Sequence, residues 1–343
     1  MENHRRMRYV GVLGGGVISV THARAALEVE GVEVAAVYGQ NREKIAHLSQ
    51  QFGGTAYDNL QAFLAHKPPD LIMIGSPSGL HAEQGIAAAQ HGLHVLVEKP
   101  IDITTERADA LINECERAGV KLGVMFQDRV APDICRLKEL VDAGELGKPI
   151  LVSGSVKWYR PPEYYGDSRW RGTWALDGGG ALMNQGVHTV DLLLWLMGDV
   201  ERVSARAVTA LHDIEVEDTV VATLEFANGA IGTLEAATSI YPGYRRRVEL
   251  TGTNGTMVLE HDRIITADLR TPVAIFPAEE SDNLDSASLP DIRGHKRLLE
   301  DFLRAIETNS KARCDGREGR RSVALVQAIY ESSRTGRAVK LTT

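Results

Sequence analysis

Residues Tyr9–His22 read YVGVLGGGVISVTH, and they set the organisation of the first half of the chain. A short apolar run is followed by three glycines and then by an apolar-periodic segment. This order predicts a strand, a tight turn and a helix, which together make a dinucleotide-binding unit. Gly14 would permit the turn, and Gly16 would let the main chain approach a pyrophosphate because it has no Cβ.

The helix after the turn would begin at Val17 and Ile18, whose free N–H groups and positive dipole end suit phosphates. Ser19 stands where a third glycine is usual, and it is small enough for close packing of the helix on the strand. An ordinary turn between a strand and a helix is the alternative interpretation of this single motif.

The rest of the first half alternates between strands and helices. We expect further strands over Val32–Tyr38, Asp70–Gly75, His94–Val97 and Lys121–Phe126. This alternation predicts an α/β fold whose N-terminal domain, residues 1–127, is a Rossmann doubly wound parallel sheet. Ligands bind such sheets beyond the carboxyl ends of the strands. The predicted cofactor contacts are therefore the residues of the turn and of the later breaks: Gly14, Gly16, Val17, Ile18, Gly39, Gln40, Asn41, Arg42, Ser76, Pro77, His81, Glu98 and Lys99.

The break after the second strand bears on the choice of cofactor. An NAD enzyme usually places an acid there to bind the ribose hydroxyls, and Gly39–Arg42 contains none. A carboxylate would repel a 2′-phosphate, whereas Arg42 could pair with one. The sequence therefore predicts NAD or NADP with a slight preference for NADP, and a solvated Arg42 is the alternative.

Lys99 lies at the last of these breaks. Pro100 restricts Lys99 to an extended conformation, so Lys99 ends a strand at the ligand edge of the sheet. From there its side chain can point at a nicotinamide and a substrate. A surface lysine paired with Glu98 is the alternative interpretation.

Residues 128–343 are expected to form a C-terminal α/β domain with a large, mostly antiparallel open sheet. A helix over Ala181–Met197 would cover one face of it, and the final helices are candidates to pack back on the first domain. Asn-Gly pairs between alternating runs favour hairpins. The expected strands are Ile150–Tyr159, Arg202–Leu211, Glu217–Phe226, Ala230–Ser239, Arg245–Gly252 and Thr256–Glu260.

Two segments of this half carry candidate site residues. Asn184, His188 and Asp191 lie at i, i+4 and i+7, so they would share one face of the predicted helix as a catalytic edge. A histidine satisfied within the core is the alternative. The loop RPPEYYGDSRWRGTW, residues 160–174, could clamp a sugar or a base, or form a rigid packed loop. The predicted substrate contacts are Asn184, Asp191, Lys157, Tyr159, Arg160, Arg169 and Arg171.

Composition limits the function classes. The 343 residues carry a net charge of −8 and no long basic block, which argues against a nucleic-acid partner. No apolar run reaches transmembrane length, and the first residues lack the apolar region of a secretory signal. Three scattered cysteines fit neither a disulfide framework nor a zinc site. We therefore expect a cytoplasmic protein without a membrane partner, a metal or a metal-ligand cluster.

The motifs occur in an order that resembles the Gfo/Idh/MocA oxidoreductases over nearly the whole chain. They are the glycine turn with His22, the segment Ser76–His81, Glu98-Lys99-Pro100, and the helix with His188 and Asp191. The ending HKRLLEDFLRAI with GREGRRSVALVQAIYESSRTGRAV is also similar. The resemblance implies a Rossmann domain and an open sheet that commonly forms subunit contacts, hence a homodimer or homotetramer. It also implies that Lys99 and His188 flank the nicotinamide and the reacting carbon.

The polar loop with GGGALMNQGVH looks closest to members that oxidise UDP-N-acetylglucosaminuronic acid at the 3-hydroxyl. Two residues depart from the family pattern: Asn184 stands where many members carry Asp, and Gly39 where an NAD-using member would carry an acid. We expect an NAD(P)-dependent dehydrogenase of a secondary hydroxyl on a sugar, sugar acid or nucleotide sugar. A glycosidase or lyase of the same fold with a retained cofactor, and a non-catalytic dinucleotide-binding sensor, are the alternatives.

Overall fold

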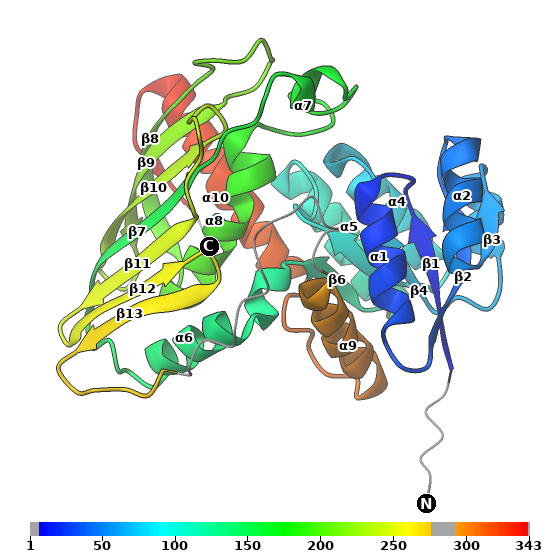
Figure 1. Ribbon diagram of the computed structural model, residues 1–343, viewed down its shortest axis with the longest axis horizontal. Helices are drawn as coiled ribbons and strands as arrows, with labels where there is room; N and C mark the ends of the chain where they lie inside the picture. The colour runs from blue at the N-terminus through cyan, green and yellow to red at the C-terminus, as the bar shows by residue number, and fades with distance from the viewer. Residues whose placement is uncertain (1–6, 276–291, 342–343) are drawn as a thin grey trace, which may run out of the picture. The chain divides into compact units, whose positions relative to one another are not determined.

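The computed structural model describes residues 7–275 and 292–341, which divide into two compact units. Figure 1 labels most of their helices and strands. The first unit runs to Gln127 and also takes in helix α9 (Arg293–Glu307) and the chain up to Arg320. The second unit begins at Asp128 and resumes at Arg321 after the segment that belongs to the first.

The first unit is built on a six-stranded parallel sheet with the order β3-β2-β1-β4-β5-β6. The central strand β4 reads LIMI and is wholly buried, as a strand covered on both faces must be. The predicted Rossmann sheet is thus confirmed, with the short edge strand β3 as an addition. The strands are β1 (Arg8–Leu13), β2 (Val32–Tyr38), β3 (Thr55–Tyr57), β4 (Leu71–Ile74), β5 (His94–Glu98) and β6 (Leu122–Met125).

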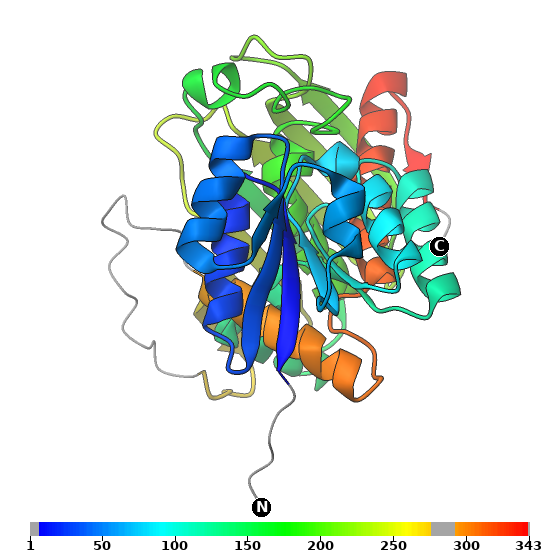
Figure 2. The same cartoon turned by 90° about the vertical axis from the view of Figure 1, so that its right-hand side faces the viewer.

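Helices cover both faces of this sheet. Figure 2 shows α1 and α2 on one side of it and α4 and α5 on the other. Helix α9 packs against α1, and its Phe302 lies against Gly123 of β6, where a Cβ would be only 2.7 Å from the Phe302 ring. The helices are α1 (Val17–Leu27), α2 (Arg42–Phe52), α3 (Leu60–Ala65), α4 (His81–Gln90) and α5 (Thr105–Ala118).

The second unit contains an eight-stranded sheet with the order β13-β12-β11-β7-β10-β9-β8-β14. Among the described strands only the central pair β7 and β10 is parallel, so the predicted, mostly antiparallel sheet is confirmed. The edge strands β13 and β14 were not predicted. The strands are β7 (Pro149–Lys157), β8 (Val200–Val208), β9 (Thr219–Phe226), β10 (Ile231–Ala237), β11 (Arg247–Gly252), β12 (Gly255–Glu260), β13 (Arg263–Leu269) and β14 (Val339–Lys340).

Helices α8 (Val187–Met197) and α10 (Gly316–Thr335) lie against one face of this sheet (Figure 1). The approach is close because Gly154 of β7 has no Cβ, which would otherwise lie 2.9 Å from Thr189 and 3.0 Å from Leu193. The unit also contains α6 (Pro132–Asp142) and the short helix α7 (Glu163–Gly166). Among the helices of the described ranges, none is long and apolar enough to cross a membrane.

The helix predicted over Ala181–Met197 needs a correction. Its first six residues, Ala181–Gly186, are π-helical, and the regular α-helix begins at Val187. Glu217 accounts for this start: its carboxylate accepts the N–H groups of Gly180 and Leu182, and its carbonyl accepts that of Ala181. The segment just before β9, rather than a capping side chain of the helix itself, therefore holds the first turn.

Candidate functional site

The glycine turn after β1 has the geometry that its sequence predicts. Gly14 adopts φ 128°, and its N–H donates to the Tyr38 carbonyl at 2.8 Å. A Cβ on Gly14 would lie 2.4 Å from the Ser19 hydroxyl and 2.7 Å from the Gly75 carbonyl oxygen. Ser19 is fully buried in the place of the usual third glycine. Only glycine fits at position 14.

The N-terminus of α1 is open toward this turn. Gly16 is the N-cap without a side-chain cap, no acidic residue lies in the first turn, and a Cβ on Gly16 would meet nothing within 4 Å. Val17 is 71% exposed although it is apolar. An uncapped helix N-terminus beside free space suits a pyrophosphate, so this observation fits the dinucleotide that the turn predicts.

After β2, two of the predicted cofactor contacts, Asn41 and Arg42, interact with nearby protein groups. The Asn41 side chain caps α2 by accepting the Lys44 N–H at 3.0 Å. Arg42 is 84% exposed and pairs with the carboxylate of Asp58, which follows the unpredicted strand β3. An acid does therefore lie near this edge, although Gly39–Arg42 contains none.

A buried histidine joins the breaks after β4 and β5. His81 is 1% exposed; its Nε2 lies 2.9 Å from the Ser76 carbonyl oxygen and its Nδ1 lies 2.8 Å from that of Pro100. The Ser76 hydroxyl donates to Gln84 at 2.6 Å, and Pro77 is half-buried beside it. His81 thus fixes the main chain on the far side of Lys99.

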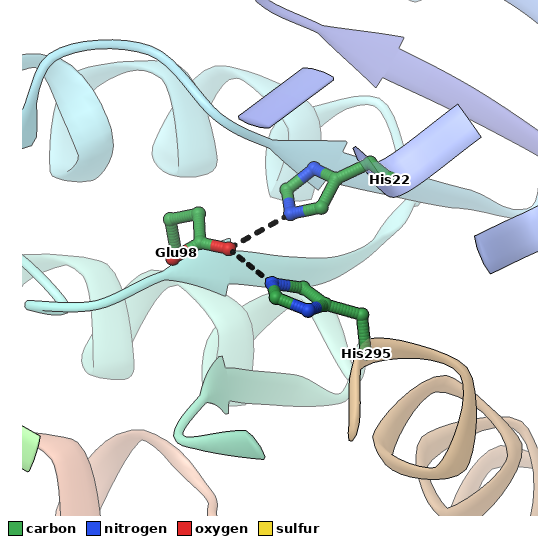
Figure 3. Close-up of side chains that lie close together, drawn as sticks. All are labelled: His22, Glu98 and His295. Atoms are coloured by element: carbon green, nitrogen blue, oxygen red, sulfur yellow. Dashed lines mark hydrogen bonds and ion pairs between the residues drawn. The ribbon is translucent and has the colours of Figure 1, made fainter. Parts of the chain in front are cut away.

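Glu98, at the end of β5, is a buried acceptor and not the surface partner of Lys99. Figure 3 shows its Oε1 between two imidazoles, with His22 Nε2 at 3.0 Å and His295 Nε2 at 3.3 Å. Its Oε2 accepts the N–H of Lys99 at 3.2 Å. Burial would raise the pKa of Glu98, but the bonds from both histidines hold that pKa well below its ordinary value, so the group is a carboxylate.

These three residues also correct the expectation that the chain holds no metal-ligand cluster. The ligand atoms of His22, Glu98 and His295 all lie within 4.8 Å of one another. Their sequence separations of 76 and 197 residues hid the cluster from a search for ligand spacing. Two imidazole N–H donors on one carboxylate oxygen account for the arrangement as hydrogen bonds.

In the second unit, His188 of α8 faces a fixed carboxylate. Its Nδ1 lies 3.5 Å from Oδ2 of Asp128, and the two side chains are 14% and 11% exposed. Arg246, itself buried, binds Asp128 and Asp262. A carboxylate beside one ring nitrogen orients an imidazole and leaves the other nitrogen for chemistry.

Asp191 lies inside the unit, which corrects its predicted contact with a substrate. Arg129 donates to both of its carboxylate oxygens at 2.7 Å, from Nε and Nη2, and the Ser322 hydroxyl donates at 3.3 Å. Both charged side chains are 1% exposed. Removing one partner of such a pair leaves a buried charge uncompensated, so Asp191 supports the fold of α8.

Asn184 belongs to a chain of hydrogen bonds that ties the polar loop to the π-helical turn. It donates to Asp177 at 2.6 Å and accepts from Gln185 at 2.9 Å. Gln185 also donates to the Tyr164 hydroxyl and accepts from Arg160, both at 2.9 Å. Asp177 thus provides a carboxylate beside the position where many family members carry Asp.

The polar loop brings two of its three arginines together. The Tyr164 ring lies 5.2 Å from the Arg160 guanidinium and 4.5 Å from that of Arg171. Arg169 is exposed. The loop is therefore packed, as one interpretation expected, and it also holds a pair of cations.

The other two predicted contacts of this half lie elsewhere on β7 and just after it. Lys157 alternates with the buried Val156, so its side chain leaves the sheet on the face away from α8, where it pairs with Glu235 at 2.6 Å. The Tyr159 ring packs edge-on against Tyr241 at 5.3 Å. Lys157 therefore pairs on the opposite face of the sheet from α8, which carries His188.

Comparison with known proteins places both halves in one family. The family model described as an oxidoreductase family with an NAD-binding Rossmann fold matches residues 8–126, and a GFO/IDH/MocA C-terminal domain matches residues 134–258. The fold and site therefore define an oxidoreductase with an NAD-binding Rossmann domain. More particularly, the chain belongs to the Gfo/Idh/MocA family, which confirms the resemblance seen in its motifs.

Several characterised relatives are sugar dehydrogenases. D-xylose 1-dehydrogenase (NADP(+)) 2 of Haloferax volcanii is 31% identical over 332 residues, which cover 96% of this chain and 99% of that one. Myo-inositol 2-dehydrogenase of Thermotoga maritima is 25% identical over 97% and 98% of the two chains. The WlbA dehydrogenase from Bordetella pertussis, solved with NADH and UDP-GlcNAcA, matches with a TM-score of 0.90, 33% identity and 99% coverage of both chains.

Proposed function

We propose that this protein is an NAD(P)-dependent dehydrogenase that oxidises a secondary hydroxyl of an acidic nucleotide sugar or sugar acid. The observation that carries the proposal is His188, presented by α8 with Asp128 against Nδ1 and Arg246 behind Asp128. The open N-terminus of α1 supports the cofactor. The similarity to a WlbA dehydrogenase solved with NADH and UDP-GlcNAcA supports the substrate class.

In this proposal His188 acts as the general base. A secondary alcohol is too weak an acid to lose its proton unaided near neutral pH, and an imidazole is suited to accept it. Asp128 holds the ring and stabilises the imidazolium that forms. Lys99 hydrogen-bonds the same oxygen and stabilises its developing negative charge. The glycine turn and the N-terminus of α1 would hold the dinucleotide, whose nicotinamide would supply the hydride acceptor needed to oxidise the alcohol to a ketone.

Arg160 and Arg171 are the proposed recognition site for an anionic group. Tyr164 lies between them, and Gln185 links the arrangement to Asn184, four residues before His188. A guanidinium binds a carboxylate or phosphate bidentately, which fixes orientation as well as charge. A neutral free sugar would leave both cations without an ionic partner.

We further propose a cytoplasmic homodimer or homotetramer that uses NADP at least as well as NAD. The face of the large sheet away from α8 exposes Leu151, Val221 and Ile231, which supports a subunit contact there. The cysteines Cys115, Cys135 and Cys314 are free thiols, which suits a reducing compartment.

The test is a panel of substrates with each cofactor, followed by the absorbance of reduced nicotinamide. It should contain UDP-GlcNAcA, UDP-GlcNAc, D-xylose and myo-inositol. The highest kcat/KM is expected for the acidic nucleotide sugar, and UDP-GlcNAc, which keeps the diphosphate but lacks the sugar carboxylate, is its matched control. Preference for a neutral free sugar would overturn the substrate class. Glycosidic cleavage without net cofactor reduction would favour the glycosidase or lyase, and cofactor binding without turnover would favour the sensor.

A further inference from the structure

Buried side chains hold the main chain on both sides of Lys99. On one side the Lys99 N–H donates to Glu98 Oε2 at 3.2 Å. On the other side the Pro100 carbonyl lies 2.8 Å from His81 Nδ1. A lysine side chain has many rotamers. The fold can fix the main chain of Lys99 and hence the direction of its Cα–Cβ bond.

The Glu98 carboxylate is fixed by side chains from two helices that are far apart in sequence. His22 belongs to α1 and His295 to α9, and both donate to the same oxygen of Glu98, as Figure 3 shows. The three residues are 0%, 5% and 7% exposed in the order His22, Glu98, His295. The carboxylate cannot rotate away from Lys99 without breaking two buried hydrogen bonds to a charged group.

We propose that His22 and His295 are positioning residues for the dehydrogenase reaction: by fixing Glu98, they set the direction in which Lys99 leaves the ligand edge of the sheet. This inference rests on the proposed function and deepens it. Loss of a donor would free the Glu98 carboxylate to turn or to take up a proton. Lys99 would then reach the substrate oxygen in poorer geometry, while the pyrophosphate turn at Gly14 stays unchanged.

The key variants are a matched pair at one position. His295→Gln keeps an N–H donor with similar reach, whereas His295→Leu removes the donor. His94→Leu is the control, because His94 begins the same strand at its opposite end and accepts the Lys121 N–H there. Should His295→Leu fail to melt cooperatively, Glu98→Gln replaces it, because the amide keeps the shape but loses the charge that binds both donors.

The first readout is steady-state kinetics at saturating cofactor. His295→Leu should lower kcat about 10- to 100-fold, the scale of a displaced catalytic group, and leave the cofactor KM nearly unchanged. His295→Gln should recover most of that loss, and His94→Leu should behave as the parent. Equal kcat in a folded His295→Leu and the parent would overturn the proposal, and so would an equal loss in His295→Gln.

The second readout does not require turnover, so it separates this inference from the proposed function. The rate of Lys99 acylation by a soluble anhydride, followed by mass spectrometry, should change with pH differently in His295→Leu than in the parent or His94→Leu. Metal analysis of the purified parent completes the test. If the parent contains about one transition-metal ion per chain and His295→Leu contains none, the three residues form a metal site instead of a hydrogen-bonded cluster, and the inference is overturned.

Discussion

Asp128 presents its carboxylate oxygen 3.5 Å from Nδ1 of His188, and Arg246 binds that same oxygen. Arg246 therefore fixes the carboxylate that faces the imidazole ring. We therefore expect substitutions to lower kcat in a fixed order. Loss of the proposed base, His188, should lower kcat most, loss of Asp128 less, and loss of Arg246 least.

We predict that His188→Asn lowers kcat by about 10²–10⁴-fold, the usual contribution of a positioned base. Asp128→Asn should lower kcat by a smaller factor, because the imidazole remains but loses its orienting charge. Because Lys99 is proposed to act on the same oxygen, Lys99→Ala with His188→Asn should cost less than the sum of the single losses in free energy. Near-normal turnover of a His188→Asn variant with a native circular dichroism spectrum would refute the assignment.

The arginines of the polar loop should differ in their effects. Arg160→Ala and Arg171→Ala should each raise KM for an acidic nucleotide sugar and leave cofactor affinity unchanged, because each removes half of the cation pair on Tyr164. Arg169→Ala is the matched control, since Arg169 is exposed on the same loop. If all three variants behave alike, the loop has a structural role or contacts another subunit.

The cofactor preference should respond to Asp58. This acid pairs with Arg42, so Asp58→Asn should raise the ratio of kcat/KM for NADP over NAD by at most about fivefold, the upper end of what a surface ion pair provides. Arg42→Ala should abolish that gain in the double variant. Gly39→Asp is a poorer test, because its Cβ would lie 2.8 Å from Ile45 Cγ2. A ratio insensitive to both single changes would remove Arg42 from the cofactor site.

Glu217 should make stability depend on pH. Burial raises the pKa of its carboxyl from 4.5 to about 7, despite the N–H groups of Leu182 and Gly180 and the Tyr330 hydroxyl that favour its charged form. The folded protein then binds more protons than the unfolded chain between these values. The free energy of unfolding should therefore fall as pH rises through this window, by at most about 1.4 kcal/mol per pH unit. Urea unfolding of Glu217→Gln, compared with the parent, should lack this component.

The exposed face of the large sheet should carry the subunit contact. Ile231 is 59% exposed at the start of the central strand β10, where it pairs with Leu151 of β7. Ile231→Glu should lower the mass measured by light scattering after gel filtration, and Thr233→Glu on the same strand face is the milder control. A parent that is already monomeric at micromolar concentration would contradict the proposed oligomer.

The architecture was largely predictable because each sheet is encoded by local sequence patterns. The glycine turn and the apolar runs predict the Rossmann sheet, and alternation with Asn-Gly turns predicts the antiparallel one. The edge strand β3 has two exposed residues of three, and β14 has only two residues, so neither carries a clear pattern. The π-helical turn depends on Glu217, which no local period of the helix reveals.

The site was predictable only where its chemistry sits in compact motifs. Lys99 and His188 stand in segments that resemble a family, but their supports come from distant positions. Arg246 lies 118 residues from Asp128, and nothing in either local sequence pairs them. For Asp191 the local pattern gives the wrong environment: helical spacing places it on the His188 face, whereas Arg129, 62 residues away, pairs with it inside the unit.

The chain order of the His22–Glu98–His295 cluster has a consequence for biosynthesis. Glu98 emerges from the ribosome 197 residues before His295, a delay of about 10–40 s at typical rates of translation. Throughout that interval the nascent Rossmann unit lacks α9 and one of the two donors to a buried carboxylate. A fragment that stops at Gln127 would keep this defect permanently, so the first unit matures only after nearly all of the second has been synthesised.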